Sequence, residues 1–173
     1  MSFALDNTSD ELNKVVIEAG RTKDIILMCS TKDEGNNQGK VYPADCGMDG
    51  NTFKIAACDG MGFRASYAYA GAEFWFQGDD IDTDVLGLSK YQTRISGSSV
   101  ATAVAAGVAS LVIACCRLDG NPITVGARNE QVREWFNRMK GKHNPTRYIK
   151  PWEVFGQKDK GAGNDKLLPR KGS

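Results

Sequence analysis

The sequence has almost no excess charge and no long uninterrupted apolar run. Its 22 lysine and arginine residues nearly balance 21 aspartate and glutamate residues, which leaves a net charge of +1 over 173 residues. No basic block is dense enough to follow a phosphate backbone, so binding to nucleic acid or to a membrane surface gets no support. The longest apolar stretch, Val100 to Cys116, is interrupted by Thr102, Gly107 and Ser110. These interruptions favour a buried helix over a membrane span.

Targeting and cross-linking features are scarce as well. Residues 1–7 contain no basic residue and no long apolar core, which excludes a signal peptide in this stretch. The cysteines are odd in number, form no CxxC pair and include two adjacent residues, which argues against a disulfide framework or a zinc site. They are Cys29, Cys46, Cys58, Cys115 and Cys116. Buried free thiols are the simpler interpretation, and they weakly favour an intracellular compartment without assigning one.

The chain is long enough for one domain with a buried core. We expect residues 1–156 to form this domain. Residues 157–173 are rich in Gly, Lys, Asp and Pro without periodicity, which predicts a disordered polar tail.

Apolar periodicity predicts strands that alternate with helices. The sequence favours a helix over 8–20, with Thr8 or Ser9 as the N-cap, Glu11 completing a capping box with Thr8, and Gly20 ending the helix. Strands are expected at 24–29, 52–58 and 91–95, a loop at 33–51, a helix over 99–116 packed on all sides, and an amphipathic helix over 130–140. The continuous apolar run 24–29 is typical of a parallel sheet covered on both faces. The order of elements predicts a layered α/β fold.

Ser99 is the candidate for chemistry. It follows a short predicted strand and Gly97, at the start of the helix whose first backbone N–H groups have no internal partners. Such N–H groups can stabilise a developing oxyanion. Ser is also a favoured N-cap, so these local features alone favour a structural role for Ser99.

A longer match favours the nucleophile. The run Gly97-Ser98-Ser99-Val100-Ala101, followed by Ala105-Ala106-Gly107, is similar to the motif Gly-Thr-Ser-x-Ala-x-Pro-x-x-Ala-Gly of the subtilisin-like serine protease family. Ser98 stands where the family has Thr, and Ala103 where it has Pro. The resemblance implies that Ser99 is the nucleophile of a doubly wound parallel-sheet fold with helices on both faces. Residues 1–156 would be the C-terminal part of the peptidase domain, and residues 148–156 resemble fungal members.

Two further blocks carry the resemblance. Residues 25–35 resemble the segment in which an apolar strand runs into Ala-Ala-Gly-Asn-Glu-Gly, and residues 1–4 resemble the strand Met-Ser-Leu-Gly that pairs with substrate backbone. Asp33 then stands at the position of the Asn that donates to the oxyanion. A carboxylate donates only when protonated, so an oxyanion role and a structural role both stay open for Asp33. The resemblance also implies a set of substrate-binding residues, namely Ser2, Phe3, Ala4, Ser30, Thr31 and Lys32. Lys32, where the family has Gly, would crowd the pocket for the residue before the scissile bond.

The triad is incomplete in this chain. The family supplies Asp and His before the substrate-pairing strand, whereas the sole histidine here is His143, after the last predicted helix, where a structural role is expected. A serine hydroxyl without a base is a poor nucleophile. We therefore expect a serine endopeptidase centre that is inactive alone, in a fragment or truncated product that needs its N-terminal half to fold well. The alternatives are a non-catalytic module that binds a peptide or a partner by strand addition, and a truncated relic.

Metal and phosphate sites are not supported by the motifs. Asp80, Asp82 and Asp84 have the first spacings of an EF-hand loop, but Val85 and Tyr91 occupy the positions that require Gly and Glu. No Gly-rich loop ends in Gly-Lys-Ser/Thr. We expect no metal and no cofactor, and a polypeptide as the ligand.

Overall fold

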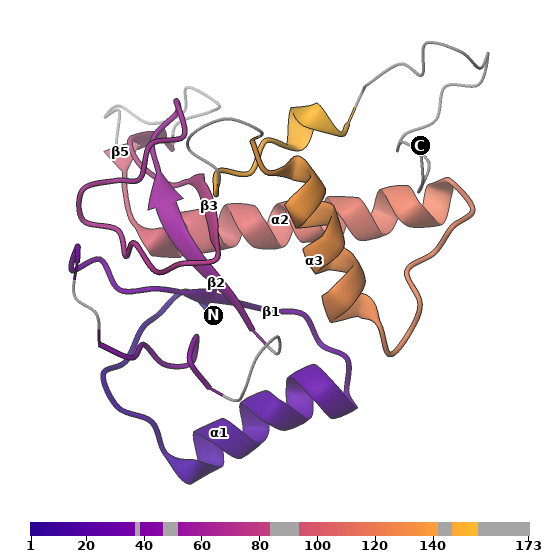
Figure 1. Ribbon diagram of the computed structural model, residues 1–173, viewed down its shortest axis with the longest axis horizontal. Coiled ribbons are helices and arrows are strands. Elements are labelled where there is room, and N and C mark those ends of the chain that lie inside the picture. Colours follow the sequence, from indigo (N-terminus) through magenta and orange to yellow (C-terminus); the bar gives the residue numbers. More distant parts are fainter. Residues whose placement is uncertain (37–38, 47–51, 84–93, 142–146, 156–173) are drawn as a thin grey trace.

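The computed structural model describes residues 1–36, 39–46, 52–83, 94–141 and 147–155, which form an α/β fold (Figure 1). Its sheet has three parallel strands in the order β1-β2-β3. Their bounds are Leu27–Ser30 for β1, Thr52–Cys58 for β2 and Phe74–Gln77 for β3. The register pairs Leu27 with Thr52 and Ile55 with Phe74. The predicted α/β class with a parallel sheet is confirmed.

The core lies between this sheet and helix α3, Arg128–Met139. Phe136 of α3 packs edge-on against Phe53 of β2 and against two phenylalanines of β3, with ring centroids 5.2–5.7 Å apart. The helix face predicted to be apolar is buried, and its members are Val132, Trp135, Phe136 and Met139. Aromatic packing of this geometry adds to the hydrophobic gain of burial.

Helix α2, Ser98–Leu118, runs beside all three strands. Its sheet-facing side is buried and consists mainly of Ala101, Ala105, Ala109 and Val112. The opposite side is open, with Val104 39% and Leu111 46% exposed. The expectation that this helix is packed on all sides is therefore wrong, because within the described residues nothing covers that side. By length and composition α2 is apolar enough to cross a membrane, but here it serves as the core helix of the sheet.

The N-terminal helix has one of its two predicted caps and differs from the sequence prediction at its C-terminal end. Helix α1 spans Asp10–Ile17 and continues as the π-helical turn η1, Glu18–Thr22. Ser9, not Thr8, caps it by accepting the Leu12 N–H at 3.1 Å. Gly20 does not end the helix, because the π-helical turn continues to Thr22, and the residue with a positive φ is Asp24, at +52°.

Short elements complete the fold. Strands β4, Ile81–Asp82, and β5, Arg94–Ile95, form an antiparallel pair, and a single 3-10 turn, η2, spans Pro151–Glu153. Strands β3 and β4 had no counterpart in the sequence prediction, whereas β2 matches it at both ends. The predicted tail 157–173 and residues 91–93 of the third predicted strand lie outside the described residues.

Candidate active site

The turn before α2 presents Ser99 at the start of the helix. Gly97 has φ 150° and ψ 154°, a backbone conformation that only glycine adopts readily. A Cβ at this position would lie 3.3 Å from Asp33 Oδ2 and 3.3 Å from Ser99 Oγ. The bare glycine therefore keeps open the space onto which both side chains face. Ser99 itself is half-buried.

The first backbone N–H groups of α2 differ in whether they have a hydrogen-bond acceptor. Asp33 accepts the N–H of Ser98, and the carbonyl of Gly97 accepts the N–H groups of Val100 and Ala101. Within the described residues, neither the N–H nor the hydroxyl of Ser99 has a hydrogen-bond partner. A free N–H beside a free hydroxyl at a helix N-terminus suits an attacking oxygen and the oxyanion that its attack creates.

Ser98 and Asp33 form a tight network beside this pair. Ser98 is fully buried, and its Oγ donates to Asp33 Oδ1 at 2.6 Å while accepting the backbone N–H of Ala57 at 3.1 Å. The Ser98 N–H lies 3.0 Å from Asp33 Oδ2 and 3.3 Å from Oδ1. The carboxylate thus holds the anion position at the positive end of α2, where a negative charge is stabilised. In this arrangement Asp33 accepts hydrogen bonds and donates none.

The segment after β3 fixes the nucleophile turn from the other side. Gly78 accepts the N–H of Gly97 at 2.8 Å, and the Asp80 N–H donates to Ser96 Oγ at 2.9 Å. Asp80 also forms an ion pair with Arg94 of β5. A Cβ on Gly78 would lie 2.7 Å from the Ala101 Cβ and 2.8 Å from the Gly97 carbonyl. The close approach of these two segments therefore requires glycine.

Tyr67 and Asp79 lie near the same turn, and sequence reasoning assigned neither a role. The Tyr67 hydroxyl donates to Asp79 Oδ1 at 2.9 Å. Burial raises the pKa of Tyr67, the bond to Asp79 and the charges of Asp79 and Asp33 raise it further, and the Ser96 hydroxyl opposes them. Gly78 and Asp79 directly follow β3, and ligands of parallel sheets bind at the carboxyl ends of strands, but this signal was not available because β3 itself was not predicted.

The expected substrate-pairing segment lies along the outer side of β1. The Met1 amino group donates to the Met28 carbonyl, and the Ser30 N–H donates to the Met1 carbonyl at 3.0 Å. Leu5 pairs with Tyr42 a few residues later. Between these anchors, the backbone groups of residues 2–4 make no hydrogen bond within the described structure. The segment is thus held at both ends with its middle free.

The three predicted pocket residues after this strand differ in what they present. The hydroxyls of Ser30 and Thr31 are buried and bond to the Thr31 and Ile55 carbonyls, so these side chains serve the sheet. The Lys32 side chain, 13% exposed, pairs with Asp6 and lies 3.7 Å from Glu34. Its charge is therefore neutralised by neighbours on both sides.

Among the described residues, no side chain forms a hydrogen bond with the Ser99 hydroxyl, so none is placed as its base. His143 lies outside the described residues, as does Asp84 of the acidic run. Of the other two members of that run, Asp80 is paired with Arg94 and Asp82 lies in β4. In the part of the chain that is described, no cluster of three His, Cys, Asp or Glu side chains is arranged to hold a metal ion.

Comparison with known proteins places the fold. No family model and no curated protein matches the chain. Among solved structures, it is similar to the self-cleaved protease domain of PatA, with a TM-score of 0.67 and 18% identity over 86% of this chain. It is also similar to the prenylagaramide maturation protease PagA, with a TM-score of 0.66 and 18% identity, and to the PatG macrocyclase in complex with peptide, with 0.66 and 15%. The chain has a subtilisin-like protease fold.

The similarity to these solved structures covers only part of their length. The chain covers 55% of the PagA and PatA structures and 48% of the PatG structure, so it spans about half the length of these relatives. The fold is shared at this level of identity. The expected closeness to fungal members and the assignment to the C-terminal half of the domain stay predictions.

Proposed function

We propose that this chain carries the nucleophile portion of a subtilisin-like serine endopeptidase centre, with Ser99 as the nucleophile. The observation that carries the proposal is the pair of free groups on Ser99, its hydroxyl and its backbone N–H, at the N-terminus of α2. In peptide cleavage, Ser99 Oγ attacks the scissile carbonyl carbon. The carbonyl oxygen becomes the oxyanion, and the Ser99 N–H is placed to donate to it.

Attack also requires a base that takes the hydroxyl proton and returns it to the leaving amine. With one histidine in the chain, placed after the last helix, we propose that the base and its orienting carboxylate come from a polypeptide segment outside these 173 residues. Without them the rate falls by about 10⁴-fold or more in serine proteases. By itself, the chain then carries the nucleophile but cleaves peptides very slowly.

The open side of α2 supports a complementing segment. The exposed face of α2 consists of small residues together with Val104 and Leu111. This face begins about one helical turn after Ser99. An apolar face next to a catalytic group is suited to a second packed layer. A segment seated there would cover the face and bring its own side chains to Ser99. The remaining part of a protease domain fits this role, since about half of each solved structure lies outside the part that matches this chain.

The test is labelling by a fluorophosphonate probe, followed by mapping of the modified peptide. We expect slow modification of Ser99, loss of labelling in Ser99→Ala, and unchanged labelling in Ser110→Ala, which alters an exposed serine of the same helix. Labelling spread over several serines, or retained in Ser99→Ala, would contradict the nucleophile assignment. Sequencing the DNA upstream of Met1 for Asp-Ser/Thr-Gly and His-Gly-Thr-like motifs tests the source of the missing groups.

A second candidate function is peptide binding without cleavage. It rests on the unbonded backbone of Ser2, Phe3 and Ala4, which an extended peptide can pair with by strand addition. Solved PatG is in complex with peptide, which makes a peptide the natural ligand to try. In the Ser99→Ala background, Ala4→Pro removes a backbone donor and should weaken peptide binding, while Ala4→Ser keeps the donor and should not. Equal affinities would exclude pairing through this segment.

A further inference from the structure

A cavity of about 320 Å³ lies at the end of α2 far from Ser99. Its walls come from the segment just before β1, the last turns of α2, and the loop that leads into α3 together with the first residue of α3. Five of its lining residues are apolar, namely Ile25, Ile26, Ile113, Pro122 and Ile123, and the other three are Asp24, Arg117 and Arg128. Its volume is at the lower end of the range for small-molecule sites.

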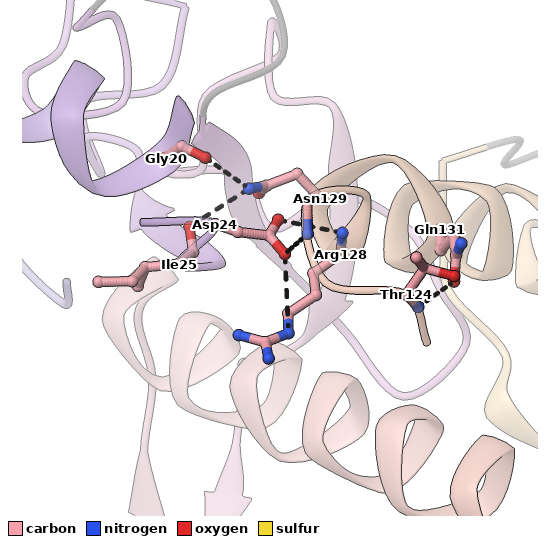
Figure 2. Close-up of polar contacts among 8 residues, drawn as sticks. Gly20, Asp24, Ile25, Thr124, Arg128, Asn129 and Gln131 are labelled. Carbon is pink, nitrogen blue, oxygen red and sulfur yellow. Dashed lines mark hydrogen bonds and ion pairs between the residues drawn. The ribbon is translucent and has the colours of Figure 1, made fainter. Parts of the chain in front are cut away.

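The carboxylate of this cavity is already satisfied by the protein. Asp24 is 6% exposed and accepts the Gly126 N–H at 2.5 Å and the Arg128 N–H at 3.1 Å, which fixes the start of α3. Its Oδ2 also lies 3.7 Å from Arg128 Nε (Figure 2). Asn129 ties the same junction together by donating to the Gly20 and Ile25 carbonyls at 3.3 Å. Asp24 therefore serves the fold and has little capacity left for a ligand.

The two arginines, by contrast, keep unused donors. Arg128 faces Asp24 with Nε, and Figure 2 shows its two terminal nitrogens pointing away from that carboxylate. In the described part of the chain, no carboxylate lies within ion-pair distance of the exposed Arg117 guanidinium. Both arginines line the same cavity, so its three charged lining residues carry a net charge of +1, with only Nε of Arg128 facing the Asp24 carboxylate.

We propose that this cavity binds a carboxylate carried by an aliphatic group, a recognition chemistry shared by the C-terminus of a peptide that ends in an aliphatic residue and by a free fatty acid. The isoleucine walls take the side chain. Arg117 and the terminal nitrogens of Arg128 receive the carboxylate, since the planar guanidinium fork matches carboxylate geometry. From Ser99 to Arg117 the helix rises by about 27 Å, so this site is separate from the candidate active site.

Protein-observed NMR of the isoleucine methyl groups tests the proposal on the full chain. N-acetyl-Gly-Ile with a free carboxylate is titrated against its C-terminal amide, and octanoate against octanamide. We expect both acids to shift the methyl signals of Ile25, Ile113 and Ile123, and the amides to bind at least about 10-fold more weakly. Arg117→Gln should also weaken binding of the acids by about 10-fold. Arg138→Gln, an arginine over the Trp135 ring outside the cavity, should leave it unchanged.

The outcomes are distinct. Binding of the peptide acid in preference to octanoate supports the peptide source, and the reverse supports a free fatty acid with the same recognition chemistry. Equal binding of acid and amide, shifts confined to isoleucines away from the cavity, or no saturation at millimolar ligand would overturn the proposal. A normal melting temperature of Arg117→Gln separates lost binding from lost folding. Labelling of Ser99 does not depend on this result, so the two proposals fail separately.

Discussion

Asp33→Asn is the substitution that most directly probes how the Ser99 site works. The carboxylate accepts the Ser98 N–H and the Ser98 hydroxyl, and it donates nothing. Asparagine keeps one acceptor oxygen for Ser98 and adds an NH₂ group that can donate to an oxyanion formed at Ser99. The substitution therefore converts a repelling charge into a donor. It removes one of the two accepting oxygens, and the oxygen that remains can still accept from Ser98.

The cost in stability can be set against the gain in reactivity. Hydrogen bonds to a charged group contribute about 1.5–3 kcal/mol and neutral ones about 0.5–1.5 kcal/mol, so the change weakens each bond by about 1 kcal/mol or less at this exposed side chain. A loss of about 1 kcal/mol lowers the melting temperature of a domain of this size by about 2–4 °C. An oxyanion donor contributes about 10²–10³-fold in rate in a complete enzyme.

We expect Asp33→Asn to speed fluorophosphonate labelling of Ser99 by about 10-fold or more, with a melting temperature a few degrees lower. Glu34→Gln is the matched control, because it removes a neighbouring negative charge that pairs with Lys32 instead of Ser98. The reasoning is refuted if Asp33→Asn labels no faster than the unaltered chain, or if Glu34→Gln gives the same increase.

The remaining predictions concern the supports of the site and the buried thiols. In a urea titration, Gly78→Ala should lower the free energy of unfolding by about 1–3 kcal/mol, because the added Cβ would lie 2.7 Å from the Ala101 Cβ of α2, and it should also slow labelling of Ser99. Gly107→Ala is the control: its added Cβ has nothing within 4 Å, so its stability should be unchanged or higher. Ser98→Ala leaves a buried backbone N–H of β2 without an acceptor and should cost about 1–3 kcal/mol, which differential scanning calorimetry would register. Burial raises the pKa of Cys29 and of Cys58 from about 9 to about 12. Because the unfolded chain then releases these protons first, stability should be full below about pH 9 and should fall towards pH 12, and a urea midpoint that stays constant from pH 8 to 10 would count against this burial.

Much of the fold was predictable because burial leaves a pattern of apolar residues in the sequence. Strand β2 is almost wholly buried and its ends coincide with the predicted ones, and the apolar face of α3 was identified from its spacing. Strand β3 was missed because Phe74 to Gln77 is only four residues long, and a short apolar run carries no periodicity that separates strand from loop. The choice of Ser9 over Thr8 as the cap depends on the backbone path into α1, which capping preferences do not specify.

The site was predictable only in part, because its motif is visible in the sequence whereas its hydrogen bonds depend on the tertiary fold. The motif around Ser99 and the position of Asp33 are visible in the sequence, and the structure places Asp33 on the residue next to Ser99. That Asp33 accepts hydrogen bonds from Ser98 depends on how the tertiary fold places the two residues. The hydrogen bond from the Gly97 N–H to the Gly78 carbonyl also depends on the tertiary fold, because it joins distant segments through backbone groups that almost every residue carries.

The most direct test of the central claim is the dependence of Ser99 labelling on added imidazole. If the chain has a nucleophile but lacks its base, free imidazole should replace that base. The account predicts that the labelling rate rises in proportion to imidazole concentration near pH 8, that the effect disappears near pH 5 where imidazole is protonated, and that Ser99→Ala shows neither. A labelling rate that does not respond to imidazole, or an imidazole-dependent signal that maps to other residues, would contradict it.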